Sequence, residues 1–197
     1  MIAFLPEVGY RGDAMRELLV ALAVLGGAVA LAAPPPWAAD LVEELVWMRD
    51  SLVEVSYFCA LATAAPTCRD QHILAMRVVD VLEGSKGPHF DPRVASGDMP
   101  GILPRLKELA QKLAQRDLPP EDKAALKFSL ENVRAFLSLA LEAALRGAGS
   151  RRLVQGAINM RQAYAFILAA LGPEDPRLAY LGGIRPLLRR YGLPHTP

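Results

Sequence analysis

The pattern of apolar and polar positions beyond residue 37 is helical almost throughout. Apolar side chains recur at alternating steps of four and three, which is the spacing of one face of an α-helix. No stretch of strand length alternates convincingly between apolar and polar residues. The clearest case is residues 38–62, with apolar positions at Leu41, Leu45, Met48, Leu52, Val55, Cys59 and Ala62. The pattern predicts a first helix that buries this face and keeps its charged residues outside.

Further helices are predicted at residues 68–83, 102–116, from the proline turn at 117–122 to 146, and 150–172, with Ser150 as the N-cap of the last. Their predicted buried positions are Ile73, Met76, Val79 and Leu82; Leu103, Leu106, Leu109 and Leu113; Leu126, Leu130, Val133, Leu137, Ala140 and Ala144; and Leu153, Ala157, Met160, Tyr164, Ile167 and Leu171. The tail is predicted to form two short helical pieces around Gly182 and Gly183. We therefore expect an all-α fold, an antiparallel bundle of four to five helices behind an N-terminal hydrophobic segment.

Length and charge narrow the class of protein further. A chain of 197 residues suits one domain with a substantial core, here residues 33–197. The formal net charge is +1 and charges of both signs are interspersed. No overall field would therefore attract nucleic acid, and we expect no nucleic-acid partner. The hydrophobic fraction of 52% is high, and the segment before residue 33 accounts for part of it.

That opening segment has no charged or polar side chain from Leu18 to Ala33, and prolines at 34–36 then end any helix. As a helix, its 16 residues would extend about 24 Å, which is shorter than the hydrocarbon core of about 30 Å. A free-standing membrane span would therefore be too short. Residues 1–32 are interpreted as a signal peptide or a hydrophobic anchor.

The features of a secretory signal peptide are all present. Arg16 supplies a basic flank, and Met15 directly before it is an alternative to Met1 as the start of the chain. Ala30 and Ala32 form an A-x-A cleavage motif that would leave Ala33 as the first residue. This interpretation predicts an extracytoplasmic protein, either periplasmic or secreted. A buried core helix is the alternative that involves no export.

The stretch RGDAMRELLVALAVLGGAVALAAP also resembles the N-terminus of type IV pilins and pseudopilins. In that family a glycine precedes the cleavage site, and a glutamate lies five residues beyond it, before an apolar helix. Gly12 and Glu17 take these places, and Gly26 and Pro34 fall where the family often has a glycine and a proline. The resemblance implies a membrane-anchored subunit that begins at Asp13 and retains its apolar helix. Contact with a membrane through residues 18–33 belongs to this alternative.

Cys59 and Cys68 are the two cysteines of the chain. An even number of cysteines in an exported protein favours a disulfide. The segment between them contains Pro66 and predicts a turn, so a bridge would link two helices at their shared corner. A zinc site is not favoured, because only His72 lies nearby and four ligands are needed. Two free thiols are the expected state if the chain is not exported.

Motifs of known catalytic sites are absent. The sequence has no G-x-S-x-G, no phosphate-binding glycine loop and no H-E-x-x-H. The three histidines are far apart in sequence. An alternative is a redox carrier, with His72 and either Met48 or Met76 as axial ligands of a haem, as in bundle cytochromes. We expect neither catalysis nor a bound cofactor or metal.

Residues 84–101 form the longest irregular stretch and contain four glycines and three prolines. Long loops are often functional, and His89, Asp91 and Asp98 would provide oxygen and nitrogen ligands for a metal or contacts for a partner. A solvated connector without a binding role is the alternative.

Five arginines form a second candidate surface. Arg151 and Arg152 lie at the predicted start of the last long helix, where the helix dipole disfavours cations. With Arg185, Arg189 and Arg190 they would make a basic surface for an anionic lipid or an acidic protein. Ordinary solvation is the alternative. The sequence as a whole predicts an exported helical bundle of the cell envelope that acts by binding a partner or as a structural component.

Overall fold

The computed structural model describes residues 36–95 and 97–191. The predicted cleavage site at Ala30, Ala32 and Ala33 and the pilin-like positions 12–34 lie outside the described residues. Over the described ranges the fold is all-α, without a strand, and an isolated β-bridge joins Gly84 to Pro100. The elements are α2 (Pro36–Thr63), α3 (Cys68–Glu83), α4 (Ile102–Gln115), α5 (Pro120–Ala148), α6 (Leu153–Leu171), the 3₁₀-helix η1 (Pro176–Leu181) and α7 (Ile184–Arg190).

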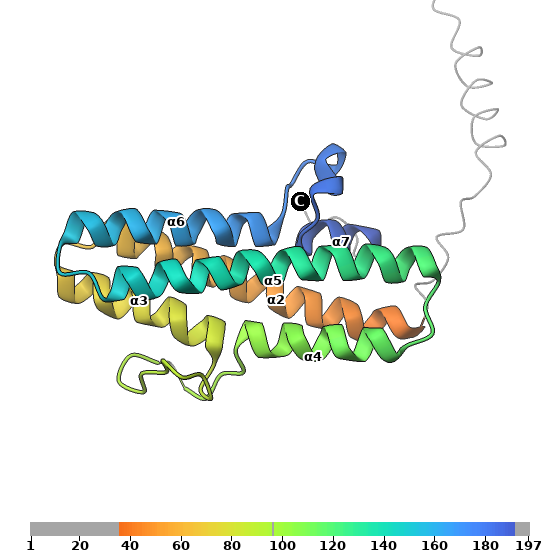
Figure 1. The fold of residues 1–197 in the computed structure, drawn as a ribbon, viewed down its shortest axis with the longest axis horizontal. Helices are drawn as coiled ribbons and strands as arrows, with labels where there is room; N and C mark the ends of the chain where they lie inside the picture. The colour runs from red at the N-terminus through yellow and green to blue at the C-terminus, as the bar shows by residue number, and fades with distance from the viewer. Residues whose placement is uncertain (1–35, 96, 192–197) are drawn as a thin grey trace, which may run out of the picture. The chain divides into compact units, whose positions relative to one another are not determined.

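The helices form a bundle of four rows (Figure 1). Two rows are the long helices α2 and α5, of 28 and 29 residues. The third row consists of α3 followed by α4, and the fourth of α6 followed by α7. Each long helix packs against members of both broken rows. The predicted helical bundle is therefore confirmed, with two of its rows interrupted by loops.

The ends of α3 and α5 follow the local sequence, whereas the N-cap predicted at Ser150 is wrong, because α6 begins at Leu153 after Arg152. Thr67 caps α3, because its side chain accepts a hydrogen bond from the backbone N–H of Asp70 at 3.1 Å. Gly84 ends this helix with a φ of 77°, a conformation that side chains other than glycine rarely adopt. Pro120 begins α5, and Glu121 and Asp122 follow in its first turn, where a negative charge is favourable.

The apolar face predicted for residues 38–62 is confirmed throughout. Each of its seven side chains is 1% exposed or less and lies in the core. The positions predicted for residues 68–83, 102–116 and 117–146 are also mostly buried, and Ile73 and Leu103 are half-buried.

The face predicted for α6 is partly wrong. Tyr164 is 37% exposed, and Leu153 and Ala157 are half-buried. The face that packs inward contains the predicted Met160, Ile167 and Leu171, together with the small or polar residues Gly156, Asn159, Ala163 and Ala170. Small side chains allow α5 to approach, and α5 presents Ala140, Ala143, Ala144 and Gly147. The large apolar residues of this segment therefore identify only part of its buried face.

One glycine of α6 lies equally close to α3. A Cβ on Gly156 would lie 1.8 Å from Oε1 of Gln71, whose side chain is buried. Nε2 of Gln71 donates to the carbonyl oxygens of Ala62 at 3.1 Å and Leu153 at 3.2 Å. The amide of Gln71 thus joins α3 to the end of α2 and the start of α6.

The predicted disulfide is wrong, because Cys59 and Cys68 are free. Cys59 points into the core with no exposed surface. Cys68 is exposed at the start of α3, where its Sγ lies 3.8 Å from the carbonyl oxygen of Arg151. The two side chains leave the α2–α3 corner in different directions, which their spacing in the sequence does not reveal. Burial raises the pKa of the Cys59 thiol to about 12.

Candidate ligand-binding groove

A groove lies between α4 and the first half of α5, and the position of α4 depends on two ion pairs with α2. The guanidinium of Arg105 binds the carboxylate of Glu44 through two hydrogen bonds of 3.0 and 2.8 Å. The same guanidinium lies 4.0 Å from the ring centroid of Trp47. At the other end of α4, Arg116 binds Asp40 at 2.9 Å. These contacts hold α4 on α2 along its length.

The groove has an apolar floor and a volume of about 520 Å³. Two exposed alanines, Ala110 and Ala114, form the α4 wall. The floor consists of the buried side chains Leu106, Leu113, Leu118, Leu126 and Leu130. Sites that bind small molecules have volumes of about 300–1,000 Å³ and are mostly apolar, so this groove has the size and chemistry of such a site.

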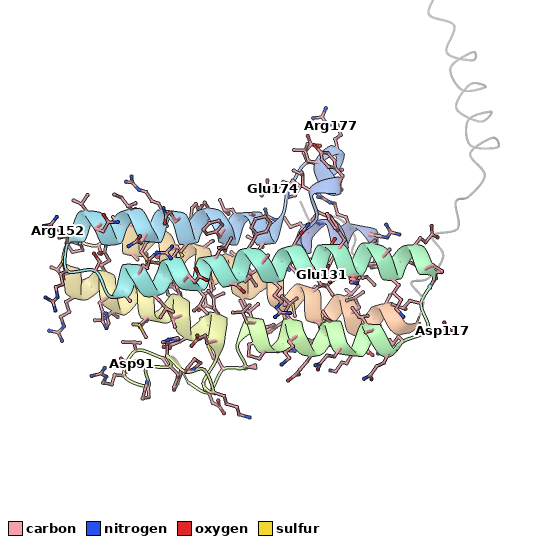
Figure 2. All side chains as sticks on the ribbon, viewed as in Figure 1. Asp91, Asp117, Glu131, Arg152, Glu174 and Arg177 are labelled. Carbon is pink, nitrogen blue, oxygen red and sulfur yellow. The ribbon has the colours of Figure 1, made fainter. Side chains whose placement is uncertain are left out.

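Four cations and one carboxylate surround this floor, which gives the rim a net charge of +3. They are Lys107 on α4 and Lys123, Lys127, Glu131 and Arg134 on α5. All five are exposed, and Glu131 lies near the middle of α5 (Figure 2). Lys123 reaches across to the carbonyl oxygen of Ala114 at 3.3 Å. Among the residues that the structure describes, these four cations form no ion pair, although the arginines at 105, 116 and 190 are all paired.

The three residues predicted as a loop site do not converge on a common point. Nδ1 of His89 lies 2.8 Å from Oε1 of Glu83, and Oγ of Ser85 donates to Oδ1 of Asp98. Asp91 binds Arg93 instead. Within the described ranges, no three His, Cys, Asp or Glu side chains are grouped as a metal site would require. These contacts close the loop onto itself and onto the end of α3.

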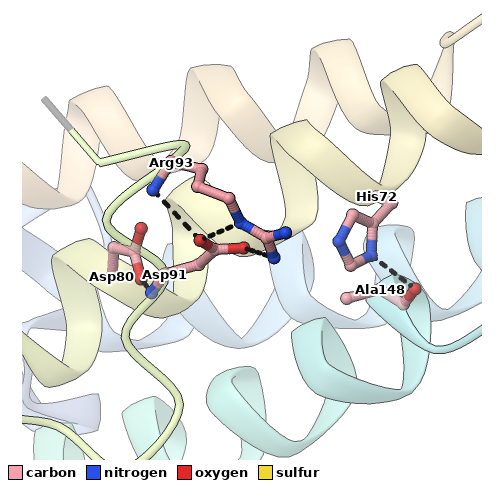
Figure 3. Close-up of polar contacts among 5 residues, drawn as sticks. All are labelled: His72, Asp80, Asp91, Arg93 and Ala148. Atoms are coloured by element: carbon pink, nitrogen blue, oxygen red, sulfur yellow. Dashed lines mark hydrogen bonds and ion pairs between the residues drawn. The ribbon is translucent and has the colours of Figure 1, made fainter.

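Figure 3 shows the pair formed by Asp91 and Arg93. Two hydrogen bonds, of 2.9 and 2.7 Å, join the guanidinium to both carboxylate oxygens, and this lowers the pKa of Asp91 to about 2. The backbone N–H of Asp91 donates to Oδ1 of Asp80 at 3.1 Å. Burial raises the pKa of Asp80, whose Oδ2 is buried and accepts no hydrogen bond from the residues that the structure describes.

The residues of the haem alternative do not face one another, because the histidine is at the surface and the methionines are in the core. His72 is exposed, and its Nδ1 lies 3.0 Å from the carbonyl oxygen of Ala148 at the end of α5 (Figure 3). Met48 and Met76 are buried in the core. His72 therefore has a structural partner at the surface, away from the buried sulfur atoms.

The five arginines lie at opposite ends of α6. Arg152 is at its start, whereas Glu174, which follows its end, lies far along the bundle (Figure 2). Arg185 and Arg189 gather around this second end, where Arg185 contacts the carboxylate of Glu174 at 3.3 Å and Arg189 donates to the carbonyl oxygen of Glu174. A helix of 19 residues is about 28 Å long. The structure therefore does not bring the predicted basic surface together.

Two features of the surface were not predicted from the sequence. One is the groove, because in the sequence its alanines and its widely spaced lysines are typical of an ordinary solvated helix face. The other is an exposed apolar stripe on the outer side of α6, formed by Val154, Ile158 and Leu168, with Val53, Tyr57 and Leu61 on the outer side of α2. The steps of four along Val53, Tyr57 and Leu61, and from Val154 to Ile158, were a signal for this stripe. None of the described helices is both long enough and apolar enough to cross a membrane.

Comparison of this chain with protein-family models, curated proteins and solved structures gave no match. Function is therefore argued from the groove itself.

Proposed function

We propose that the protein is a binding protein that holds a small ligand in the groove between α4 and α5 and catalyses no reaction. The observation that carries this proposal is the combination of a leucine floor with a volume of about 520 Å³ and a rim of unpaired cations. An apolar hollow of this size in contact with solvent exposes area that a ligand would bury. The two arginines that hold α4 on α2, Arg105 and Arg116, are paired with carboxylates, whereas the cations of the rim face solvent beside the apolar floor.

The site of action proposed here is the cell envelope. The support is the sequence from Arg16 to Ala33, with its basic flank, apolar run and A-x-A motif. The free thiols at Cys59 and Cys68 favour the alternative without export, because an exported chain was expected to join them, so this part of the proposal rests on the N-terminal sequence alone. N-terminal analysis of protein from its host tests this part, since cleavage at the A-x-A motif leaves Ala33 as the first residue.

A second candidate function is a membrane-anchored, pilin-like subunit. The observation that favours it is the exposed apolar stripe on α2 and α6, because a subunit of an assembly needs a lateral surface. This candidate requires a mature chain that begins at Asp13 and retains residues 18–33. The same N-terminal analysis therefore separates the two candidates.

Binding in the groove is tested with the neutral fluorescent probe N-phenyl-1-naphthylamine, whose emission rises in apolar sites. Ala114→Phe should fill the groove and weaken binding by about tenfold or more, because the probe loses its contact with the floor. Ala135→Phe places the same ring at an exposed position of α5 that does not line the groove. Equal binding by both variants would place the probe elsewhere, for example on the stripe of α2 and α6, and would contradict the proposal.

A further inference from the structure

We infer that the ligand of this groove is an amphiphilic anion with one alkyl chain and an acidic head, such as a fatty acid. This inference rests on the proposed function, because it names the class of ligand for the same site. The apolar floor matches the chain, and the net charge of +3 on the rim matches the head. A neutral apolar ligand would make no use of the rim.

The charges are not distributed evenly along the groove. Lys123 and Lys127 are one helical turn apart at the start of α5, and the contact of Lys123 with Ala114 places them beside the end of α4. Arg134 lies two to three turns further along α5, where it and Lys107 of α4 share the rim with Glu131, and Glu131 is one turn from Lys127 as well as from Arg134. The potential is therefore most positive at Lys123 and Lys127. We place the acidic head there.

From this position an alkyl chain can follow the floor. Leu113 and Leu126 lie at the lysine end of the groove, and Leu106 and Leu130 lie towards Arg134. Burying apolar area against these side chains stabilises the complex, while the lysines keep the head in contact with water. An acidic amphipathic peptide is the competing partner, but a helix about 10–12 Å wide requires a longer open trough than this volume provides.

The inference is tested by calorimetric titration of the full chain with four matched probes. Octanoate has the chain and the acid, octan-1-ol has the chain without charge, octylammonium reverses the charge, and acetate has the acid without the chain. We expect octanoate to bind about tenfold more tightly than octan-1-ol, and octylammonium and acetate to bind more weakly than both. The advantage of octanoate should decrease as salt is raised, because the rim is exposed.

The head position is tested with Lys127→Gln, which removes one rim charge and keeps a side chain of similar length. This variant should bind octanoate several-fold more weakly and should bind octan-1-ol as the unmodified chain does. Lys112→Gln is the matched control, because Lys112 is an exposed lysine of α4 that does not line the groove. A merely unfolded variant would lose both probes, and this difference separates loss of charge from loss of structure.

The outcomes separate the ligand class from the binding function. Equal affinity for octanoate and octan-1-ol overturns the anionic class and leaves the groove as a neutral binding site, and an equal effect of both lysine variants overturns the placement of the head at Lys127. Failure of every alkyl probe and of the fluorescent probe removes the proposed function as well. Binding of an oligoglutamate peptide that displaces octanoate, with higher affinity, would assign the groove to an acidic protein instead.

Discussion

α5 contacts two neighbours in opposite ways. Towards its C-terminal end it packs on α6 through Ala140, Ala143, Ala144 and Gly147, all of them buried. Near its start it faces α4 across a groove of about 520 Å³, although Ala110 and Ala114 on α4 are also small. Small residues therefore bring two helices together only when both helices carry them. Across the groove they face lysines, whose charged ends remain in water and leave the space unfilled.

Packing has a different consequence on each side. Along α5 and α6, close contact leaves no room for additional atoms, so the sequence tolerates little change there. Along α4 and α5, the hollow exposes leucines that a ligand would cover. The following four predictions compare the closely packed part of the bundle, where α3, α5 and α6 meet, with the part around α4, beginning with the largest effect.

Gly156→Ala should lower the free energy of unfolding by about 2–4 kcal/mol. The added Cβ would lie 1.8 Å from Oε1 of Gln71 and would displace the amide that binds Ala62 and Leu153. Urea denaturation measures the change. The sign of the change in the free energy of unfolding is informative, because alanine in place of glycine within an exposed helix normally stabilises the helix by about 1 kcal/mol.

Gly149→Ala is the matched control for this substitution. Gly149 follows α5 with a φ of −77°, and the nearest atom that its Cβ would meet is the carbonyl oxygen of Leu145 at 3.5 Å. We expect a change within about 0.5 kcal/mol. If both variants were equally stable, the close packing around Gln71 would be contradicted.

The same substitution on the two sides of α5 should give different results. Ala144→Leu inserts three carbon atoms where the side chain has no exposed surface, and it should destabilise the protein by about 1–3 kcal/mol. Ala114→Leu inserts them into the groove and should leave stability within about 0.5 kcal/mol. Denaturation of both variants gives the comparison directly. Comparable losses would mean that the groove is as tightly packed as the contact between α5 and α6.

Arg105→Met should lower the free energy of unfolding by about 1–2 kcal/mol, because the variant loses the two hydrogen bonds to Glu44 and the contact with Trp47. Both side chains of this ion pair are less than a third exposed, so solvent screens it only in part. Arg146→Met is the control, since its contact with Glu142 is exposed and 3.8 Å long. The Arg105 variant should also bind octanoate more weakly because α4 is held less firmly.

Sequence periodicity was sufficient where the buried face of a helix carries its large apolar residues. The face of α2 from Leu41 to Ala62 is the example, since every predicted position is buried. It was not sufficient for α6, where the buried amide of Gln71 on α3 leaves room only for glycine at Gly156, and the larger Val154 is 74% exposed. Hydrophobicity does not report how near the next helix comes.

The candidate groove could not be predicted from the sequence for a related reason. Its floor consists of leucines such as Leu106 and Leu126 that the periodicity correctly places on buried faces. Whether the space above them is filled depends on the side chains of both helices and on the distance between the helix axes. The arginines at 152 and 185 illustrate the same limit, because only the fold shows that α6 separates them.

The smallest effect on stability is predicted for Cys68→Ala, at the tightly packed end of the bundle. With free cysteines the free energy of unfolding should change by less than about 0.5 kcal/mol, whereas loss of a disulfide closing this short loop would cost about 2–3 kcal/mol.

Iodoacetamide provides a second measurement. It reacts with thiolates, so at pH 8 the exposed Cys68 should be modified in the native protein. Cys59 should be protected, because it is buried and its pKa is raised to about 12. Intact mass should show one adduct in buffer and two in denaturant, without any reductant. A protein that accepts no adduct in denaturant until it is reduced would have the two sulfur atoms joined, and the packing described here around Cys59 would have to open to allow it.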